Sequence, residues 1–192
     1  MNLGGNTLSD IWVRWGALTK SLISTRIAVE RERALWDDLE VTEKAELRLR
    51  TPVREAGLTV VDHVEALDDE STVLTATFVL SYALAEAAAL NRLGIDFRAG
   101  LGVEEWGTRL LLDAGRTWSD VPEGLSGAVE VAVVRNLILH GQTEFDVQSC
   151  VRLATAGNIS HAVGDPVVLD YAQVELYRGR LLDLLTVGGL GD

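Results

Sequence analysis

The sequence contains little cysteine and little proline. Its 192 residues include one cysteine, Cys150, and three prolines. A single cysteine excludes a disulfide within the chain and fits a reducing compartment. With so few prolines and no Gly/Ser-rich stretch, nothing marks a linker between two domains. Hydrophobic residues make up 47% of the chain, so we expect residues 1–192 to form a single domain with its own core.

Several kinds of functional site are missing as well. No two histidines or cysteines have the spacing of metal ligands, so we expect neither a metal site nor a cofactor. Gly100, Gly102 and Gly107 do not form a dinucleotide-binding fingerprint, because no strand precedes them, and there is no Walker sequence. Basic and aromatic residues are not interleaved as they are in proteins that bind single strands.

The sequence also lacks a clear membrane segment. The longest apolar-rich stretch, residues 73–93, includes Glu86 and Arg92, so we interpret it as a buried helix. Residues 1–10 lack the charged and apolar regions of a signal peptide. We therefore expect a cytoplasmic protein that does not associate with a membrane.

The charge is strongly acidic and unevenly distributed. The formal net charge is −12, with a net charge of +1 on residues 1–54 and −13 on residues 55–192. An acidic chain does not bind long nucleic acids non-specifically, because attraction to phosphates supplies most of that affinity. Any RNA would have to be recognised by a locally basic site, by its shape, or through a partner.

Helical periodicity predicts an all-α fold, a bundle of four or five helices. The clearest helix is apolar nearly all round, runs from about residue 72 to residue 93 and stops at Gly94, so it should be central. Before it, we expect an N-terminal helical arm over about 9–49 and a helix that begins at Thr51-Pro52 and ends in a loop at 68–70. After it, we expect helices over 103–114 and 121–140 and a short helix that ends near residue 156. A last helix is expected to begin at Asp170, with Gln173 in its first turn.

The two ends of the chain are interpreted as additions to this bundle. The N-terminal arm (about 9–49) is one, and a C-terminal hairpin and helix (about 158–187) is the other. A small β-hairpin is expected near residues 159–169, where two apolar runs flank Gly164-Asp165. The glycine-rich end, residues 188–191, is expected to be a flexible tail.

One short stretch carries most of the chemistry. Arg135 and Asn136 are followed by three apolar residues, His140 and Gly141, in a chain with five asparagines and three histidines. On a helix, Asn136 and His140 share a face, and the long side chain of Arg135 can reach the same end. Histidine at a helix C-terminus suits general acid–base catalysis, and a guanidinium suits a phosphate. Attack of a ribose 2′-hydroxyl on the adjacent phosphate needs these groups and no metal.

This stretch resembles the R-N-x-x-x-H signature of the HEPN superfamily, whose members are mostly all-α and include many metal-independent ribonucleases. The resemblance extends to the central helix with Tyr82 and Glu86 and to the general all-α layout. It implies a homodimer in which two motifs face each other in a composite site. Arg135 would stabilise the phosphate, His140 would act as general base or acid, and Asn136 would be a positioning residue. Glu86 and Tyr82 would support them.

Many HEPN nucleases act in prokaryotic defence or toxin–antitoxin systems. The resemblance therefore implies an RNA substrate and, as a further partner, an antitoxin or regulatory protein. Some family members have lost catalysis and serve as modules that bind a partner protein or a nucleotide, and this alternative stays open. The motif can also be purely structural, with His140 capping the helix end and Arg135 paired with an acid such as Glu130.

Overall fold

A computed structural model describes residues 8–46, 59–96 and 100–191. Within these ranges the chain is an all-α helical bundle, which confirms the predicted fold class. The described α-helices are α1 (Leu8–Asp37), α2 (Val41–Glu46), α3 (Val60–Asp68), α4 (Ser71–Leu93), α5 (Val103–Asp113), α6 (Gly124–Leu139), α7 (Val147–Thr155) and α8 (Tyr171–Leu185). A 3-10 turn (Trp118–Asp120) precedes α6, and a π-type turn (Thr186–Leu190) extends α8.

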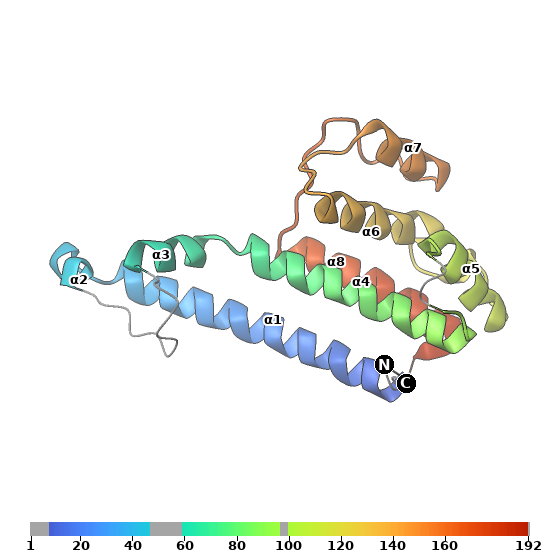
Figure 1. The fold of residues 1–192 in the computed structure, drawn as a ribbon, viewed down its shortest axis with the longest axis horizontal. Helices are drawn as coiled ribbons and strands as arrows, with labels where there is room; N and C mark the ends of the chain where they lie inside the picture. Colours follow the sequence, from blue (N-terminus) through green and yellow to red (C-terminus); the bar gives the residue numbers. More distant parts are fainter. Residues whose placement is uncertain (1–7, 47–58, 97–99, 192) are drawn as a thin grey trace.

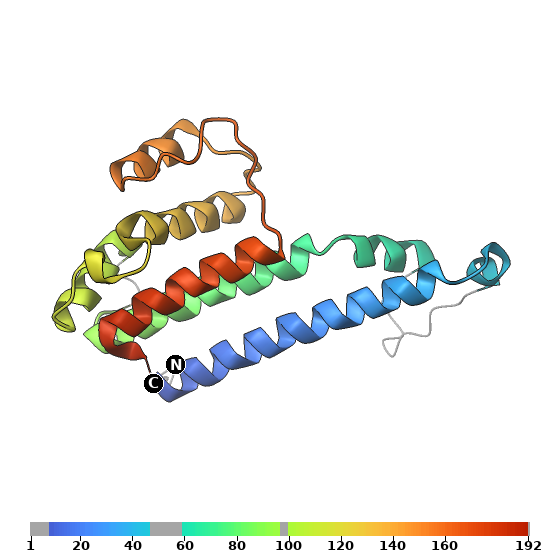
Figure 2. The ribbon, with the colours of Figure 1, turned by 180° about the vertical axis from the view of Figure 1, so that it is seen from behind.

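Helix α4 is the centre of the bundle, as predicted. It packs against α1, α8, α5 and α6. α1 lies on one side of α4 and α8, and α6 and then α7 lie on the other side (Figure 1, Figure 2). Of the described helices, α4 alone is long and apolar enough to span a membrane, and half of its most apolar window is buried in the bundle. Its position between four neighbours accounts for its apolar composition.

The predicted arm over residues 9–49 is helical but broken between α1 and α2. Residues 47–49 and the predicted helix start at Thr51-Pro52 lie outside the described residues. The helix in this region, α3, begins after a capping box. The backbone N–H of Asp62 donates to Thr59 Oγ1 at 3.2 Å, and the backbone N–H of Thr59 donates to Asp62 Oδ2 at 2.8 Å. This exchange satisfies two backbone donors at the helix start.

The predicted β-hairpin over residues 159–169 is wrong, because this segment pairs with another part of the chain. The backbone N–H of Phe145 donates to the carbonyl of Asp165 at 2.9 Å. An isolated antiparallel bridge joins Glu144 to Pro166. Proline has no N–H to donate to a ladder, so the second arm of the expected hairpin cannot be an ordinary strand. The segment instead fastens the start of α8 to the connection between α6 and α7.

The helix predicted from residue 121 begins a few residues later, at Gly124. The expected capping residue Asp120 is itself part of a capping box that begins one turn earlier. The backbone N–H of Thr117 donates to Asp120 Oδ2 at 2.8 Å, at the start of the 3-10 turn. Glu123 then has a left-handed backbone with φ of 58°. The chain therefore changes direction before α6 can start.

The starts of α7 and α8 are set by aspartate caps. Asp146 Oδ1 accepts from the backbone N–H of Ser149 at 2.7 Å, and Asp170 Oδ1 accepts from that of Gln173 at the same distance. The second of these confirms the start predicted from Asp170 and Gln173. Local capping is visible in a sequence because both partners are three residues apart.

The flexible tail predicted for residues 188–191 is wrong. Gly188 and Leu190 are buried, and this turn packs against α5. A Cβ built on Gly188 would lie 2.6 Å from Cγ of Leu110, which is itself fully buried. The glycine is needed for close approach, and not for flexibility.

Gly188→Ala is expected to lower the free energy of unfolding by roughly 1–3 kcal/mol, because the new methyl group overlaps Leu110. Gly179→Ala is the matched control, since Gly179 lies within α8 and a Cβ there would meet nothing within 4 Å. The control should be neutral or stabilise the protein by about 0.5–1 kcal/mol. Urea denaturation followed by circular dichroism measures both. Wild-type stability in Gly188→Ala would contradict the tight packing of this turn on α5.

Candidate functional site

The motif lies at the C-terminal end of α6. Val131, Val134 and Leu137 are buried and anchor the helix in the core. The backbone N–H of His140 donates to the carbonyl of Asn136 at 3.0 Å, which makes His140 the last residue of the helical hydrogen-bond pattern. Because its side chain is exposed, the imidazole of His140 is accessible to a ligand.

Asn136 and His140 line one pocket of about 250 Å³ between α6 and α7. The four-residue spacing therefore places both side chains on one face, as the helical periodicity predicts. Most of the other lining side chains are polar. They come from the connection after α6 and from α7, and they are Gln142, Asp146, Gln148, Ser149 and Arg152.

Arg135 does not line this pocket but lies behind it, against α4. Its Nη1 donates to Asn136 Oδ1 at 2.8 Å. Its Cζ is 5.1 Å from the ring centroid of Tyr82, close enough for a cation–π interaction. Its Nε is buried and has no hydrogen-bond partner among the described residues. In this structure Arg135 therefore holds the amide of Asn136, and its own guanidinium is not presented to the pocket.

Tyr82 and Glu86 of α4 both interact with Arg135. Burial raises the pKa of Glu86, and the positive charge of Arg135 opposes this rise only in part. Burial, reinforced by the charge of Glu86, raises the pKa of Tyr82 to about 12, so its phenol stays neutral under Arg135. Tyr82, Glu86, Arg135 and Asn136 thus form one cluster, and His140 follows one turn further along α6.

Arg152 is the cationic residue of this pocket, and the sequence analysis did not single it out. Its Nε and Nη2 donate to the two carboxylate oxygens of Glu104 at 2.7 and 2.8 Å. This bidentate pair raises the pKa of Arg152, lowers that of Glu104 and joins α7 to the first turn of α5. One feature of the sequence could have drawn attention to Arg152, since no other Lys or Arg occurs between Arg135 and Arg178.

The charged side chains at the pocket do not make it basic, because Arg152 is the one cation among the described residues there, beside the two carboxylates of Glu104 and Asp146. Arg152 is paired with Glu104, and Asp146 also lines the pocket while it caps α7. The backbone N–H and hydroxyl of Ser149 lower the pKa of Asp146, which keeps this carboxylate ionised. A phosphate would therefore meet no broad basic surface here and would depend on individual hydrogen-bond donors such as Arg152.

The purely structural interpretation of the motif allowed a pair between Arg135 and Glu130, but the two side chains do not pair in the structure. The carboxylate of Glu130 instead lies among polar and charged groups from the segment after α7 and from α8. Asn158 Nδ2 donates to it at 2.6 Å and the Tyr177 hydroxyl at 3.2 Å, His161 Nε2 lies 3.3 Å away, and Arg180 Nη1 forms an ion pair with it at 3.2 Å. Burial alone would raise the pKa of Glu130, but Arg180, His161 and Asn158 together lower it.

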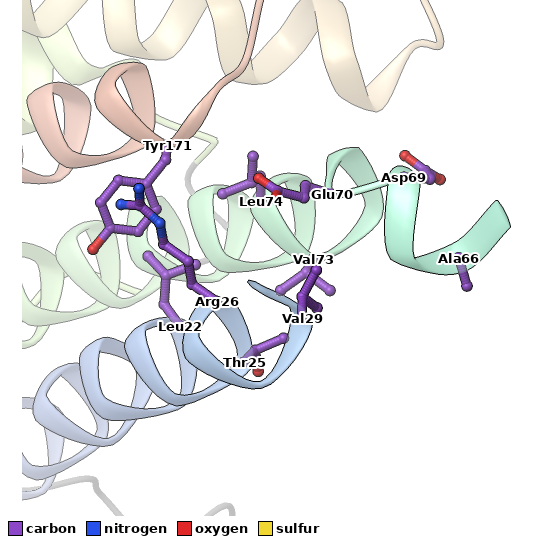
Figure 3. A pocket seen from close by; sticks show the side chains of 10 residues that line it. All are labelled: Leu22, Thr25, Arg26, Val29, Ala66, Asp69, Glu70, Val73, Leu74 and Tyr171. Carbon is purple, nitrogen blue, oxygen red and sulfur yellow. The ribbon is translucent and has the colours of Figure 1, made fainter. Parts of the chain in front are cut away.

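A further hollow lies between α1, the α3–α4 connection and Tyr171 (Figure 3). It measures only about 40 Å³ and is mainly apolar, with Leu22 and Leu74 in its walls. Arg26 lies over the ring of Tyr171 at 4.1 Å, and it is already paired with Glu30 on its own helix. Its two carboxylates already have partners, since Asp69 accepts from the backbone N–H of Ser71 and Glu70 lies 4.0 Å from Arg33, so it offers little for catalysis.

Within the described ranges, no group of three or more His, Cys, Asp or Glu side chains could hold a metal ion. Neither a protein-family profile, nor a curated protein, nor a solved structure matches this chain. Functional inference therefore rests on the chemistry of the site residues.

Glu130→Gln is expected to lower the free energy of unfolding by about 2–3 kcal/mol at neutral pH, because Arg180 loses its most buried counter-charge. The pKa of Glu130 is lowered in the folded state. Its contribution is thus present above the unfolded pKa of about 4.3 and is lost as the pH falls through the folded value. Urea denaturation between neutral and acidic pH should show wild type and variant converging below about pH 4.

Glu175→Gln is the control for this comparison, since Glu175 is exposed on α8. It should leave the stability almost unchanged at every pH. A deficit of Glu130→Gln that stays constant from neutral to acidic pH would contradict an ionised, stabilising Glu130.

Proposed function

We propose that this protein is a metal-independent endoribonuclease of the HEPN type, which cuts RNA by attack of a ribose 2′-hydroxyl on the adjacent phosphate. The observation that supports the proposal is the accessible pocket at the end of α6. Asn136, His140 and Arg152 line it together, and Arg135 is bonded to Asn136 behind it. The resemblance of the motif suggests the reaction class, and the pocket provides groups that suit it.

In the proposed reaction, His140 takes the proton of the 2′-hydroxyl or donates one to the departing 5′-oxygen. The 2′-oxygen forms a bond to phosphorus and the bond to the 5′-oxygen breaks, which leaves a 2′,3′-cyclic phosphate. Arg152 offers positive charge to the phosphate oxygens, where negative charge builds up. Arg135 acts as a positioning residue, because its bond to Oδ1 leaves the amide N–H groups of Asn136 to face the RNA.

The reaction needs both a base and an acid, but one chain places one histidine in this pocket. A homodimer with facing motifs would supply a second His140, in agreement with the composite site that the HEPN resemblance implies. The same resemblance suggests a cytoplasmic protein in prokaryotic defence or a toxin–antitoxin pair, with an antitoxin or regulatory protein as partner.

The second candidate is a non-catalytic helical module that binds a partner protein or a nucleotide. The observation in its favour is electrostatic. Residues 55–192 carry a net charge of −13, and the one arginine in the pocket is already paired with Glu104. Such a pocket would suit a ligand with few phosphates better than a long RNA.

Cleavage of total and transfer RNA in EDTA tests the proposal directly. The wild type should leave 2′,3′-cyclic phosphate ends, and His140→Ala should cut at least about 100-fold more slowly, because it loses its general acid–base group. Arg135→Ala should also cut more slowly, since Asn136 loses its anchor. Equal cleavage by all three proteins would place the activity elsewhere. No cleavage by the folded wild type would favour the binding module.

Arg152→Gln is expected to reduce kcat/KM for RNA by roughly 10- to 100-fold, through loss of a charged hydrogen bond to the phosphate. Arg109→Gln is the matched control, because Arg109 pairs with Glu105 on the exposed side of α5, away from the pocket. The control should keep wild-type kcat/KM. If both variants cut alike, Arg152 would have no role beyond its pair with Glu104.

A further inference from the structure

A second cavity lies beside the same helix, separate from the His140 pocket. It measures about 330 Å³ and is enclosed by α6, by α8 and by the segment between α7 and α8. Val133 of α6 lines the His140 pocket, whereas Val134 lines this second cavity. The two cavities therefore lie on neighbouring sides of α6. Nothing in the proposed cleavage reaction uses the second one.

The ionic groups at the inner end of this cavity are already paired. The carboxylate of Glu130 is held by Arg180 and by His161, and Arg180 also pairs with Glu123. An ion that entered would have to compete with these pairs and lose its own hydration. The cavity therefore favours an uncharged ligand.

The other walls combine a flat aromatic unit with apolar side chains. The ring of His161 stacks on Phe145, with centroids 4.2 Å apart and planes inclined by 11°. Its Nε2 lies against Glu130, which keeps the imidazole in one orientation. Val168 and Leu176 contribute exposed apolar surface. Such walls suit a ligand with flat apolar faces.

Polar groups with unused hydrogen-bonding capacity lie along the same walls. Nδ1 of His161 and the side-chain amide of Gln173 make no hydrogen bond to the described part of the chain, and both residues line the cavity. A purely aliphatic ligand would leave these groups unpaired, which is unfavourable.

We propose that this cavity binds an uncharged heteroaromatic ring of the nucleobase class. A nucleobase offers flat faces to Val168 and Leu176, and its edge carries both donors and acceptors for Gln173. The choice of a nucleobase over other such rings rests on the proposed function, because an RNA substrate supplies these rings. A base held here anchors the RNA beside the His140 pocket without taking part in the chemistry.

Binding of adenosine, guanosine, cytidine and uridine, each as the free uncharged nucleoside, tests the proposal by saturation-transfer NMR on the full chain. At least one nucleoside is expected to bind, while ribose alone is not. Gln173→Ala should weaken that binding roughly 3- to 10-fold, the effect of one lost hydrogen bond. Val168→Arg should abolish binding, because the residue is exposed at the cavity wall and the longer side chain fills it. His140→Ala should bind like the wild type.

Failure of all four nucleosides to bind overturns the proposal. Binding that survives both Gln173→Ala and Val168→Arg also overturns it, since the ligand would then occupy another place. RNA cleavage is measured separately, so the two proposals fail in different ways. Cleavage without nucleoside binding supports the ribonuclease proposal and contradicts the nucleobase site. Nucleoside binding without cleavage supports the nucleobase site and contradicts the ribonuclease proposal.

Discussion

The layer formed by α1, α4 and α8 is built around one buried guanidinium. Arg178 is only 6% exposed, and no carboxylate pairs with it within the described part of the chain. It donates to Ser81 Oγ on α4 and to Thr19 Oγ1 on α1, and its Cζ lies 4.6 Å from the ring of Trp15. Burial lowers its pKa. A buried charge without such partners is very costly, so these contacts specify how α1 and α4 align on α8.

The same helix α8 connects this layer to the elements that carry the candidate sites. Arg178 faces α1 and α4, whereas its near neighbours Tyr177 and Arg180 reach Glu130 on α6. The position of α6, and with it that of Asn136 and His140, therefore depends on a helix that is itself fixed from the opposite side. Charged and aromatic side chains with partners in several elements make such a bundle specific as well as stable.

The sequence predicted the features that depend on near neighbours along the chain. The shared face of Asn136 and His140 follows from helical spacing, and the stop of α4 at Gly94 follows from its left-handed backbone. The inward turn of Arg135 could not be predicted, because it depends on Tyr82 in another helix. The role of Arg152 was hidden for the same reason, since only the packed structure brings it beside His140. The expected hairpin failed because distant backbone groups near Phe145 paired with its second arm.

The pair between Arg152 and Glu104 gives the His140 pocket a sensitivity that the core does not share. α7 packs mainly on α6, and this pair also joins it to α5. Both side chains are about one third exposed, at 32% and 38%, so dissolved ions screen their attraction. Burial of apolar side chains in the layers below does not weaken in the same way. The ionic strength of the surroundings therefore acts on the outer wall of the pocket before it acts on the fold.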